Sequence, residues 1–196
     1  MIYEKSEFLI NLQKKNLIKE KIDWIKNLNQ INFHPTIYIA NEFFDAIPIK
    51  QFFKRKEHWF ERFVDLNNLK DAKFREEKTN IKKIEDLLKL KISKNQNIIE
   101  YSPKTFKYLK IICNKIKKYN GGILIIDYGY LNAKMQESLQ AVKNHKYSNI
   151  LKNIGDSDIT YHISFNLFKQ FAVKFNNLDT IITNQKKFLT SMGILQ

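Results

Sequence analysis

The segment NIIEYSPKTFKYLKIICNKIKKYNGGILIID, residues 97–127, has the pattern of a strand followed by a helix and a second strand. Ser102 and Pro103 are residue types that begin helices. The predicted helix has an apolar face at helical spacing, made of Phe106, Leu109, Ile112, Cys113 and Ile116. Asn-Gly-Gly at 120–122 ends this helix, and the apolar run after it predicts a buried strand.

Strands and helices also alternate outside this segment. Residues 1–4 predict the end of a strand, and Ser6 is suited to cap a helix that follows it. The apolar run 36–40 is typical of a strand that is buried on both faces. The C-terminal part predicts a helix at 164–176, a strand at 180–183 and a helix at 185–192. Buried strands separated by helices indicate an α/β fold with an open sheet of mainly parallel order.

Two segments do not fit this alternation. Residues 47–66 have aromatic and apolar residues on both sides of a polar centre, which predicts an inserted antiparallel β-hairpin. Residues 129–148 show little periodicity and are interpreted as a long functional loop. The length of 196 residues favours a single domain, 1–196.

Composition excludes several classes of protein. With 43% hydrophobic residues the chain can bury a core, and its one cysteine, Cys113, excludes an intrachain disulfide and a cysteine zinc site. No apolar run approaches the length of a membrane span. The net charge of +14 comes from 31 Lys and only three Arg, scattered along the chain. Because nucleic-acid surfaces lean on clustered Arg, a Lys-rich RNA-binding protein is only a minor alternative.

Polar residues follow three of the predicted strands, where ligands of open α/β sheets bind. Glu4 follows the first strand, and a carboxylate there either accepts ribose hydroxyls or stabilises a helix start. The second strand is followed by the amide and acids of Asn41, Glu42 and Asp45, which either bind a cationic substrate or include a simple helix cap. Asp127 and Tyr128 follow the strand at 123–126 and either face a ligand or form a plain exit from the strand.

His162 is a further candidate for acid–base chemistry. It lies in the polar segment 155–162, where two acids and a hydroxyl are close in sequence, although a lone histidine near a helix start is more often a packing or capping residue. The sequence contains no pair of histidines at metal-ligand spacing and no calcium-loop pattern, so no metal site is expected.

At these residues the sequence resembles the MidA-like class I S-adenosylmethionine-dependent methyltransferases. This family includes a mitochondrial protein arginine methyltransferase that acts in respiratory complex I assembly. The resemblance rests on five blocks in the same order along the chain: IANEFFDAIPI at 39–49 with Gln51-Phe52, EYSP at 100–103, IIDYGY at 125–130, LQAVKNHKY at 139–147, and DIT at 158–160 with His162 and Phe165.

The resemblance implies a Rossmann-like methyltransferase sheet and S-adenosylmethionine as the cofactor. It implies cofactor contacts for Glu4, Asn41, Asp127 and Tyr128. For a protein arginine substrate, Glu42 and Asp45 would hold the guanidinium, since paired carboxylates match its donors. His162 completes the catalytic candidates.

The family's first strand and its Gly-rich cofactor motif have no counterpart before Glu4. We therefore expect an incomplete sheet that binds S-adenosylmethionine poorly on its own. The expected partner is a protein substrate, such as a respiratory complex I subunit, in the mitochondrial matrix or a bacterial cytoplasm. An alternative is a catalytically inactive fragment that serves as a protein-binding module.

Overall fold

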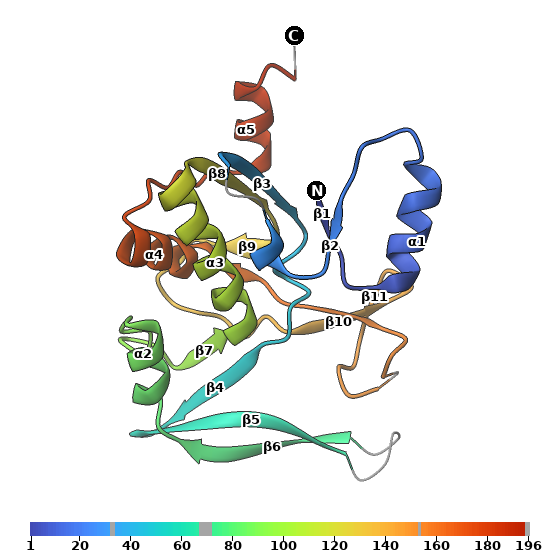
Figure 1. Ribbon diagram of the computed structural model, residues 1–196. Coiled ribbons are helices and arrows are strands. Elements are labelled where there is room, and N and C mark those ends of the chain that lie inside the picture. Colours follow the sequence, from blue (N-terminus) through green and yellow to red (C-terminus); the bar gives the residue numbers. More distant parts are fainter. Residues whose placement is uncertain (32–33, 67–71, 153, 195–196) are drawn as a thin grey trace.

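The computed structural model describes residues 1–31, 34–66, 72–152 and 154–194 (Figure 1). Its elements, in chain order, are β1 (Ile2–Tyr3), α1 (Glu7–Asn16), β2 (Trp24–Ile25), the 3-10 helix η1 (Leu28–Gln30), β3 (Thr36–Asn41), β4 (Lys50–Arg55), β5 (His58–Leu66), β6 (Ala72–Thr79), α2 (Lys82–Leu88), β7 (Ile98–Tyr101), α3 (Pro103–Tyr119), β8 (Gly121–Ile126), β9 (Gly129–Tyr130), β10 (Gln140–Lys143), β11 (Lys146–Ser148), β12 (Asp158–Thr160), β13 (Ile163–Ser164), α4 (Phe165–Asn176) and α5 (Gln185–Ser191).

The predicted helix at the centre of the chain is confirmed as α3. The Ser102 hydroxyl accepts a hydrogen bond from the Thr105 amide, and Pro103 occupies the first turn. The whole predicted apolar face of α3 is buried. It packs with aromatic residues of α4, where the Phe106 and Phe171 ring centroids lie 4.9 Å apart. Burial of this face holds α3 and α4 against each other and against β8.

Parallel pairing occurs in three separate two-stranded sheets, β1 with β2, β3 with β8, and β13 with β9. In the β3–β8 pair the register runs from Thr36 beside Gly121 to Asn41 beside Ile126. Both strands therefore end side by side. The predicted α/β class is correct in outline, but the prediction of one mainly parallel sheet is wrong for the described residues, since their largest sheet is antiparallel.

That antiparallel sheet has the strand order β6-β5-β4-β7 (Figure 1). Strands β4 and β5 are the hairpin expected within 47–66, and β6 extends it with a strand that sequence reasoning missed. Strand β7 pairs with β4, so the two strands that flank α3 belong to different sheets. The buried side chains of Gln51 and Glu100, opposite each other in this register, hydrogen-bond and help to fix β7 there.

The interpretation of 129–148 as one long loop is wrong. Only 131–139 lacks regular structure, because β10 and β11 form an antiparallel hairpin and β9 pairs with β13. The hairpin turns at Asn144-His145, both with positive φ, which is the conformation of a type I′ hairpin turn. The strand predicted at 180–183 is absent, and Ile181 there is 95% exposed.

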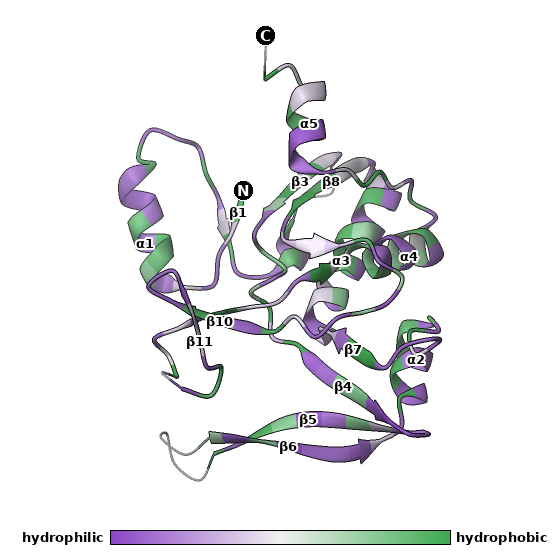
Figure 2. Cartoon of the chain, turned by 180° about the vertical axis from the view of Figure 1, so that it is seen from behind, coloured by the Kyte–Doolittle hydropathy of each residue, from purple (hydrophilic) through white to green (hydrophobic). Residues whose placement is uncertain are grey.

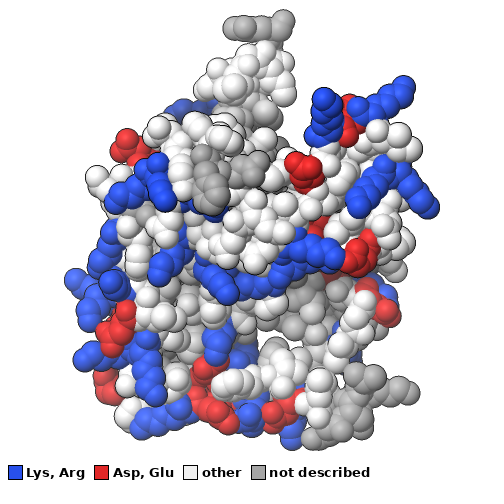
Figure 3. Space-filling model, in the orientation of Figure 1, with Lys and Arg blue, Asp and Glu red and all other residues white. Residues whose placement is uncertain are grey.

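The prediction that residues 36–40 are buried on both faces is also wrong. Tyr38 and Ala40 belong to the core side, whereas Ile37 and Ile39 are 71% and 72% exposed. In the view from behind, no helix lies across β3 (Figure 2). Lys and Arg are spread over the face seen in Figure 3 and do not form one patch. Among the described residues, no helix is long and apolar enough to cross a membrane.

Candidate active site at the carboxyl ends of the parallel strands

The segments that follow β3 and β8 are held together by one carboxylate. Oδ2 of Asp127 accepts hydrogen bonds from the amides of Phe44 (3.0 Å) and Asp45 (3.4 Å), and Oδ1 accepts from the Tyr128 amide (2.8 Å). This arrangement follows from the β3–β8 register, which ends both strands at the same level. Sequence reasoning placed these residues at strand ends, and the structure brings them into contact.

Asp45 lies beside Asp127 and is the most deeply buried acid of the candidate site, with 5% of its surface exposed. Its Oδ1 atom is inaccessible and has no hydrogen-bond partner among the described residues. An unpaired buried carboxylate oxygen costs free energy, and a cationic donor would recover that cost once the surrounding residues move to admit it. The site is therefore suited chemically to a positively charged group.

The Asp45 carboxylate raises the proton affinity of Asp127. Burial raises the pKa of Asp127 to about 6, the Asp45 carboxylate raises it as well, and the three amide hydrogen bonds act in the opposite direction. Burial likewise raises the pKa of Asp45, a hydrogen bond from the Ala46 amide acts in the opposite direction, and Glu42 and Asp158 add repulsion. Four acids thus gather locally in a chain whose net charge is +14, which gives this region a negative field that attracts cations.

These pKa shifts predict a pH dependence of stability. A folded-state pKa of about 6 lies above the ordinary 3.8, so Asp127 stabilises the fold when protonated, and this contribution is lost as pH rises from about 4 to above 6. We expect Asp127→Asn to remove that loss, so that its free energy of unfolding falls by about 1 kcal/mol less than that of wild type between pH 5 and pH 8, after allowance for solvent screening. The variant should be the less stable protein at pH 5, because an amide offers one acceptor oxygen to the three backbone amides. Urea unfolding of both proteins at pH 5 and pH 8 measures this. A free energy of unfolding that changes equally with pH in the two proteins would contradict it.

A third segment, 161–163, closes the site. The Tyr161 amide donates to the Asp45 carbonyl (3.1 Å), and the Ile163 amide donates to the Tyr128 carbonyl (2.9 Å). His162 lies between them, half-buried, and its amide donates to the Ser138 hydroxyl (2.9 Å). These hydrogen bonds place the segment 161–163 against the two aspartates. Sequence reasoning missed Tyr161, whose ring is buried here and whose pKa is raised by that burial.

Glu4 lies at the end of β1, and aromatic side chains connect this end to the end of β3. The Tyr3 ring packs edge-on against Phe43, with 5.9 Å between centroids, and its hydroxyl is 2.8 Å from that of Tyr108. Oε1 of Glu4 accepts from the amides of Lys5 (2.7 Å) and Ser6 (2.8 Å) at the start of α1. One oxygen of Glu4 thus stabilises a helix start, and neither hydrogen bond uses Oε2.

The remaining predicted residues lie on the outside of the site. Asn41, Glu42 and Tyr128 are exposed, and Glu42 has a φ of 44°, a left-handed conformation that turns the chain sharply after β3. Glu42 is anchored by its amide, which donates to the Ile126 carbonyl (2.8 Å). Among the described residues, no group of three or more His, Cys, Asp or Glu side chains could hold a metal ion.

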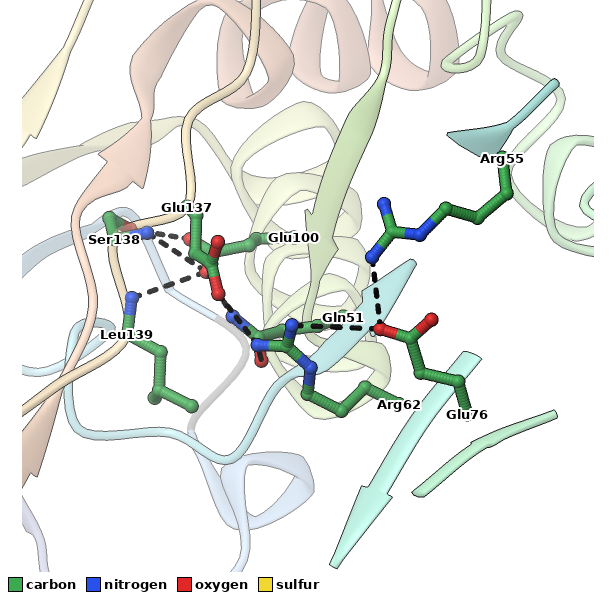
Figure 4. A network of polar contacts seen from close by, with 8 residues as sticks. All are labelled: Gln51, Arg55, Arg62, Glu76, Glu100, Glu137, Ser138 and Leu139. Carbon is green, nitrogen blue, oxygen red and sulfur yellow. Dashed lines mark hydrogen bonds and ion pairs between the residues drawn. The ribbon is translucent and has the colours of Figure 1, made fainter. Parts of the chain in front are cut away.

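Glu100 anchors the loop 131–139 beneath this site (Figure 4). Its Oε1 accepts from Gln51 Nε2 (2.8 Å) and from the amides of Ser138 (3.0 Å) and Leu139 (3.2 Å), and its Oε2 accepts from the Ser138 hydroxyl. Because the same hydroxyl accepts from the His162 amide, Glu100 positions 161–163 through Ser138. The network continues outward to Arg62, which bonds to Glu137 (2.6 Å).

Comparison with known proteins identifies the family of the chain. A family model described as "Putative S-adenosyl-L-methionine-dependent methyltransferase" matches residues 1–183. The chain belongs to this family. The match includes the ends of β1, β3 and β8 and the segment 161–163, so every residue of the candidate site lies within it.

Curated relatives of this methyltransferase-family chain are about twice as long. The chain is 29% identical to "Protein arginine methyltransferase NDUFAF7 homolog, mitochondrial" from Caenorhabditis elegans, over 98% of this chain and 50% of the relative. It is 26% identical to "Protein arginine methyltransferase NDUFAF7, mitochondrial" from Homo sapiens, over 88% of this chain and 38% of the relative. The 196 residues therefore span half or less of the length of these relatives.

Solved structures share the fold. A COG1565 superfamily member from Burkholderia thailandensis, crystallised with S-adenosyl-homocysteine, superposes with a TM-score of 0.76 at 20% identity. The match covers 99% of this chain and 52% of that chain. A native crystal structure of a COG1565 superfamily protein from the same organism gives a TM-score of 0.78, over 54% of that chain.

Proposed function

We propose that this chain carries substrate-binding and cofactor-binding residues of an S-adenosylmethionine-dependent protein arginine N-methyltransferase. The observation that carries the proposal is the buried Asp45 carboxylate, whose Oδ1 has no partner among the described residues and lies beside a second acid, Asp127. A guanidinium supplies the planar set of charged donors that such carboxylates accept. The names of the curated relatives support arginine as the substrate side chain.

In this proposal the buried Asp45 and the exposed Glu42 bind the guanidinium. Glu4, Asn41, Asp127 and Tyr128 form the cofactor side, since they lie at the carboxyl ends of β1, β3 and β8. The Glu4 Oε2 atom fits a ribose hydroxyl, because both amides at the start of α1 bond to Oε1. When bound, S-adenosylmethionine supplies a methyl group carried on a sulfonium.

The residues of this chain contribute positioning and charge to the methyl transfer. Carboxylates that orient the guanidinium keep the attacking nitrogen in line with the methyl group, so that an N–C bond forms as the S–C bond breaks and S-adenosyl-homocysteine leaves. The methylated nitrogen then loses one proton. His162 is the proposed acceptor, because its segment is fixed to Asp45 and Tyr128 by backbone hydrogen bonds. We propose a respiratory complex I subunit as substrate, in the mitochondrial matrix or a bacterial cytoplasm.

Binding of an arginine peptide tests the role of Asp45 without need of the cofactor. We expect Asp45→Asn to weaken calorimetric binding of an arginine peptide about 10–100-fold, the worth of a charge-assisted hydrogen bond. The matched control is Asp156→Asn, an exposed acid paired with Lys143, which should leave the affinity unchanged. A citrulline peptide should bind no better to wild type than to Asp45→Asn. Equal binding of the arginine peptide to both proteins would refute the role of Asp45.

Binding of S-adenosylmethionine tests the cofactor-binding part of the proposal. We expect the 196-residue chain to bind S-adenosylmethionine only weakly in calorimetry, because the described part contributes the ends of β1, β3 and β8 and no Gly-rich loop for the methionine part of the cofactor. Micromolar binding would show that Glu4, Asn41, Asp127 and Tyr128 suffice. In that case Glu4→Gln should weaken binding, whereas Glu57→Gln on the exposed β4–β5 turn should not.

A further inference from the structure

Strand β12 runs along the acids of the candidate site. The Tyr161 amide, directly after the strand, donates to the Asp45 carbonyl (3.1 Å). Asp158, the first residue of the strand, is close enough for its charge to act on the Asp45 carboxylate. Among the described residues β12 pairs only with β10, at one side of the three-stranded antiparallel sheet β11-β10-β12. The other edge of β12 is therefore open beside the buried Asp45.

The register shows which backbone groups lie on this open edge. The residues that flank the two-residue turn of the β10–β11 hairpin form a hydrogen-bonded pair, and because backbone groups alternate in direction along a strand, Ala141 also directs its own to β11. Ile159 is opposite Ala141 in the β10–β12 register, so its N–H and C=O point away from β10. In the described part of the chain, nothing hydrogen-bonds to these two groups.

The open edge is acidic on one face. Gln140 Nε2 donates across the strands to Thr160 Oγ1 (3.2 Å), so both side chains lie on one face of the sheet. Asp158, two positions before Thr160, shares that face, whereas the side chain of Ile159 points to the other.

The acids at this edge lack cationic partners. Asp158 is exposed and, like the exposed Glu42, belongs to no ion pair among the described residues. The chain has 34 Lys and Arg against 20 Asp and Glu, yet none of the described cations neutralises Asp158. A free backbone edge beside unpaired acids is suited to an extended peptide that carries positive charge.

We propose that the substrate arginine lies in an extended segment that adds an antiparallel strand to the free edge of β12, in the order arginine, any residue, basic residue. The central residue of the segment pairs with the N–H and C=O of Ile159. In an antiparallel pair its N-terminal neighbour is then opposite Thr160, and its C-terminal neighbour is opposite Asp158. The first neighbour is the arginine, directed to Asp45, and the second is a cation that pairs with Asp158.

The inference rests on the proposed function, to which it adds the conformation of the substrate and a basic residue at a fixed position. Two peptides of equal composition and charge test the order, one with Arg-Val-Lys and one with Lys-Val-Arg between alanines. We expect Arg-Val-Lys to bind about 2–5-fold more tightly in calorimetry, the worth of an exposed ion pair. Asp158→Asn should abolish this difference. Asp156→Asn, a nearby exposed acid paired with Lys143, should preserve it.

Hydrogen exchange tests the added strand itself. The Ile159 amide should exchange rapidly in the chain alone and about 10-fold or more slowly with saturating Arg-Val-Lys peptide. The Thr160 amide, which faces β10, is the internal reference and should change less. N-methylation of the valine removes the donor to the Ile159 carbonyl and should weaken binding of the peptide about 3–10-fold.

The outcomes distinguish this inference from the proposed function. If the peptide binds through Asp45 while the Ile159 amide stays unprotected, or if both peptide orders bind equally, the added strand is refuted and the proposed function stands. If the peptides bind equally to wild type and Asp45→Asn, both are refuted. If the Ile159 amide is already protected in the chain alone, and more so at higher protein concentration, a second copy of the chain occupies the edge instead.

Discussion

Glu100→Ala is expected to lower the free energy of unfolding by about 3–5 kcal/mol. The substitution removes the acceptor of four hydrogen bonds and leaves the buried Gln51 amide and the half-buried backbone amides of Ser138 and Leu139 unpaired. Each donor left unpaired costs about 1–3 kcal/mol, part of which is recovered when the loop relaxes. Urea unfolding of wild type and variant measures the difference.

The structure also predicts which amides would exchange faster in the Glu100→Ala variant. Because the Ser138 hydroxyl links Glu100 to the His162 amide, hydrogen exchange should accelerate at 138, 139 and 162 before it does so in α3. Glu137→Gln is the matched control, since Glu137 belongs to the same network but is exposed, and Arg62 is its ion-pair partner among the described residues. A surface ion pair of this kind is worth at most about 1 kcal/mol. A Glu100→Ala variant as stable as Glu137→Gln would refute the anchoring role.

Local signals in the sequence were sufficient for the elements around α3. The Ser102-Pro103 start, the five-residue apolar face and the stop at Asn120 all depend on interactions within one helix, and all are confirmed. The polar residues after β3 and β8 could also be placed together, because two parallel strands in register must end at the same edge. Site residues that follow such strands are therefore accessible to sequence reasoning.

Long-range pairing was less accessible. Nothing local indicates that β7 pairs with β4 and β8 with β3, since an apolar strand fits either sheet. Glu100 was visible only as part of the EYSP block, and its role depends on residues nearly forty positions away. The β10–β11 hairpin did have a signal that was overlooked, a two-residue turn beginning with Asn144.

The β9–β13 pair requires glycine at position 129, because a Cβ atom added there would lie 2.3 Å from the Ile163 carbonyl oxygen.

Gly121→Ala is expected to destabilise the fold by about 3–5 kcal/mol through the first residue of β8. Its φ of +117° is a conformation that side chains rarely adopt, and an added Cβ would lie 2.0 Å from the Thr36 carbonyl oxygen. That oxygen belongs to the backbone of β3 and cannot move without opening the β3–β8 pair at Thr36 and Gly121. Strain at such a φ costs about 1–3 kcal/mol, and lost pairing adds to it.

Gly155→Ala is the control that separates the two causes. Gly155 also has a positive φ, +88°, but an added Cβ there meets no atom within 4 Å. It should cost only the backbone term, about 1 kcal/mol. Because β3 and β8 carry the Asn41–Asp45 and Asp127–Tyr128 segments, Gly121→Ala should also weaken binding of the arginine peptide, whereas Gly155→Ala should not. Equal losses of stability in the two variants would mean that the close approach of β8 to Thr36 does not hold the site together.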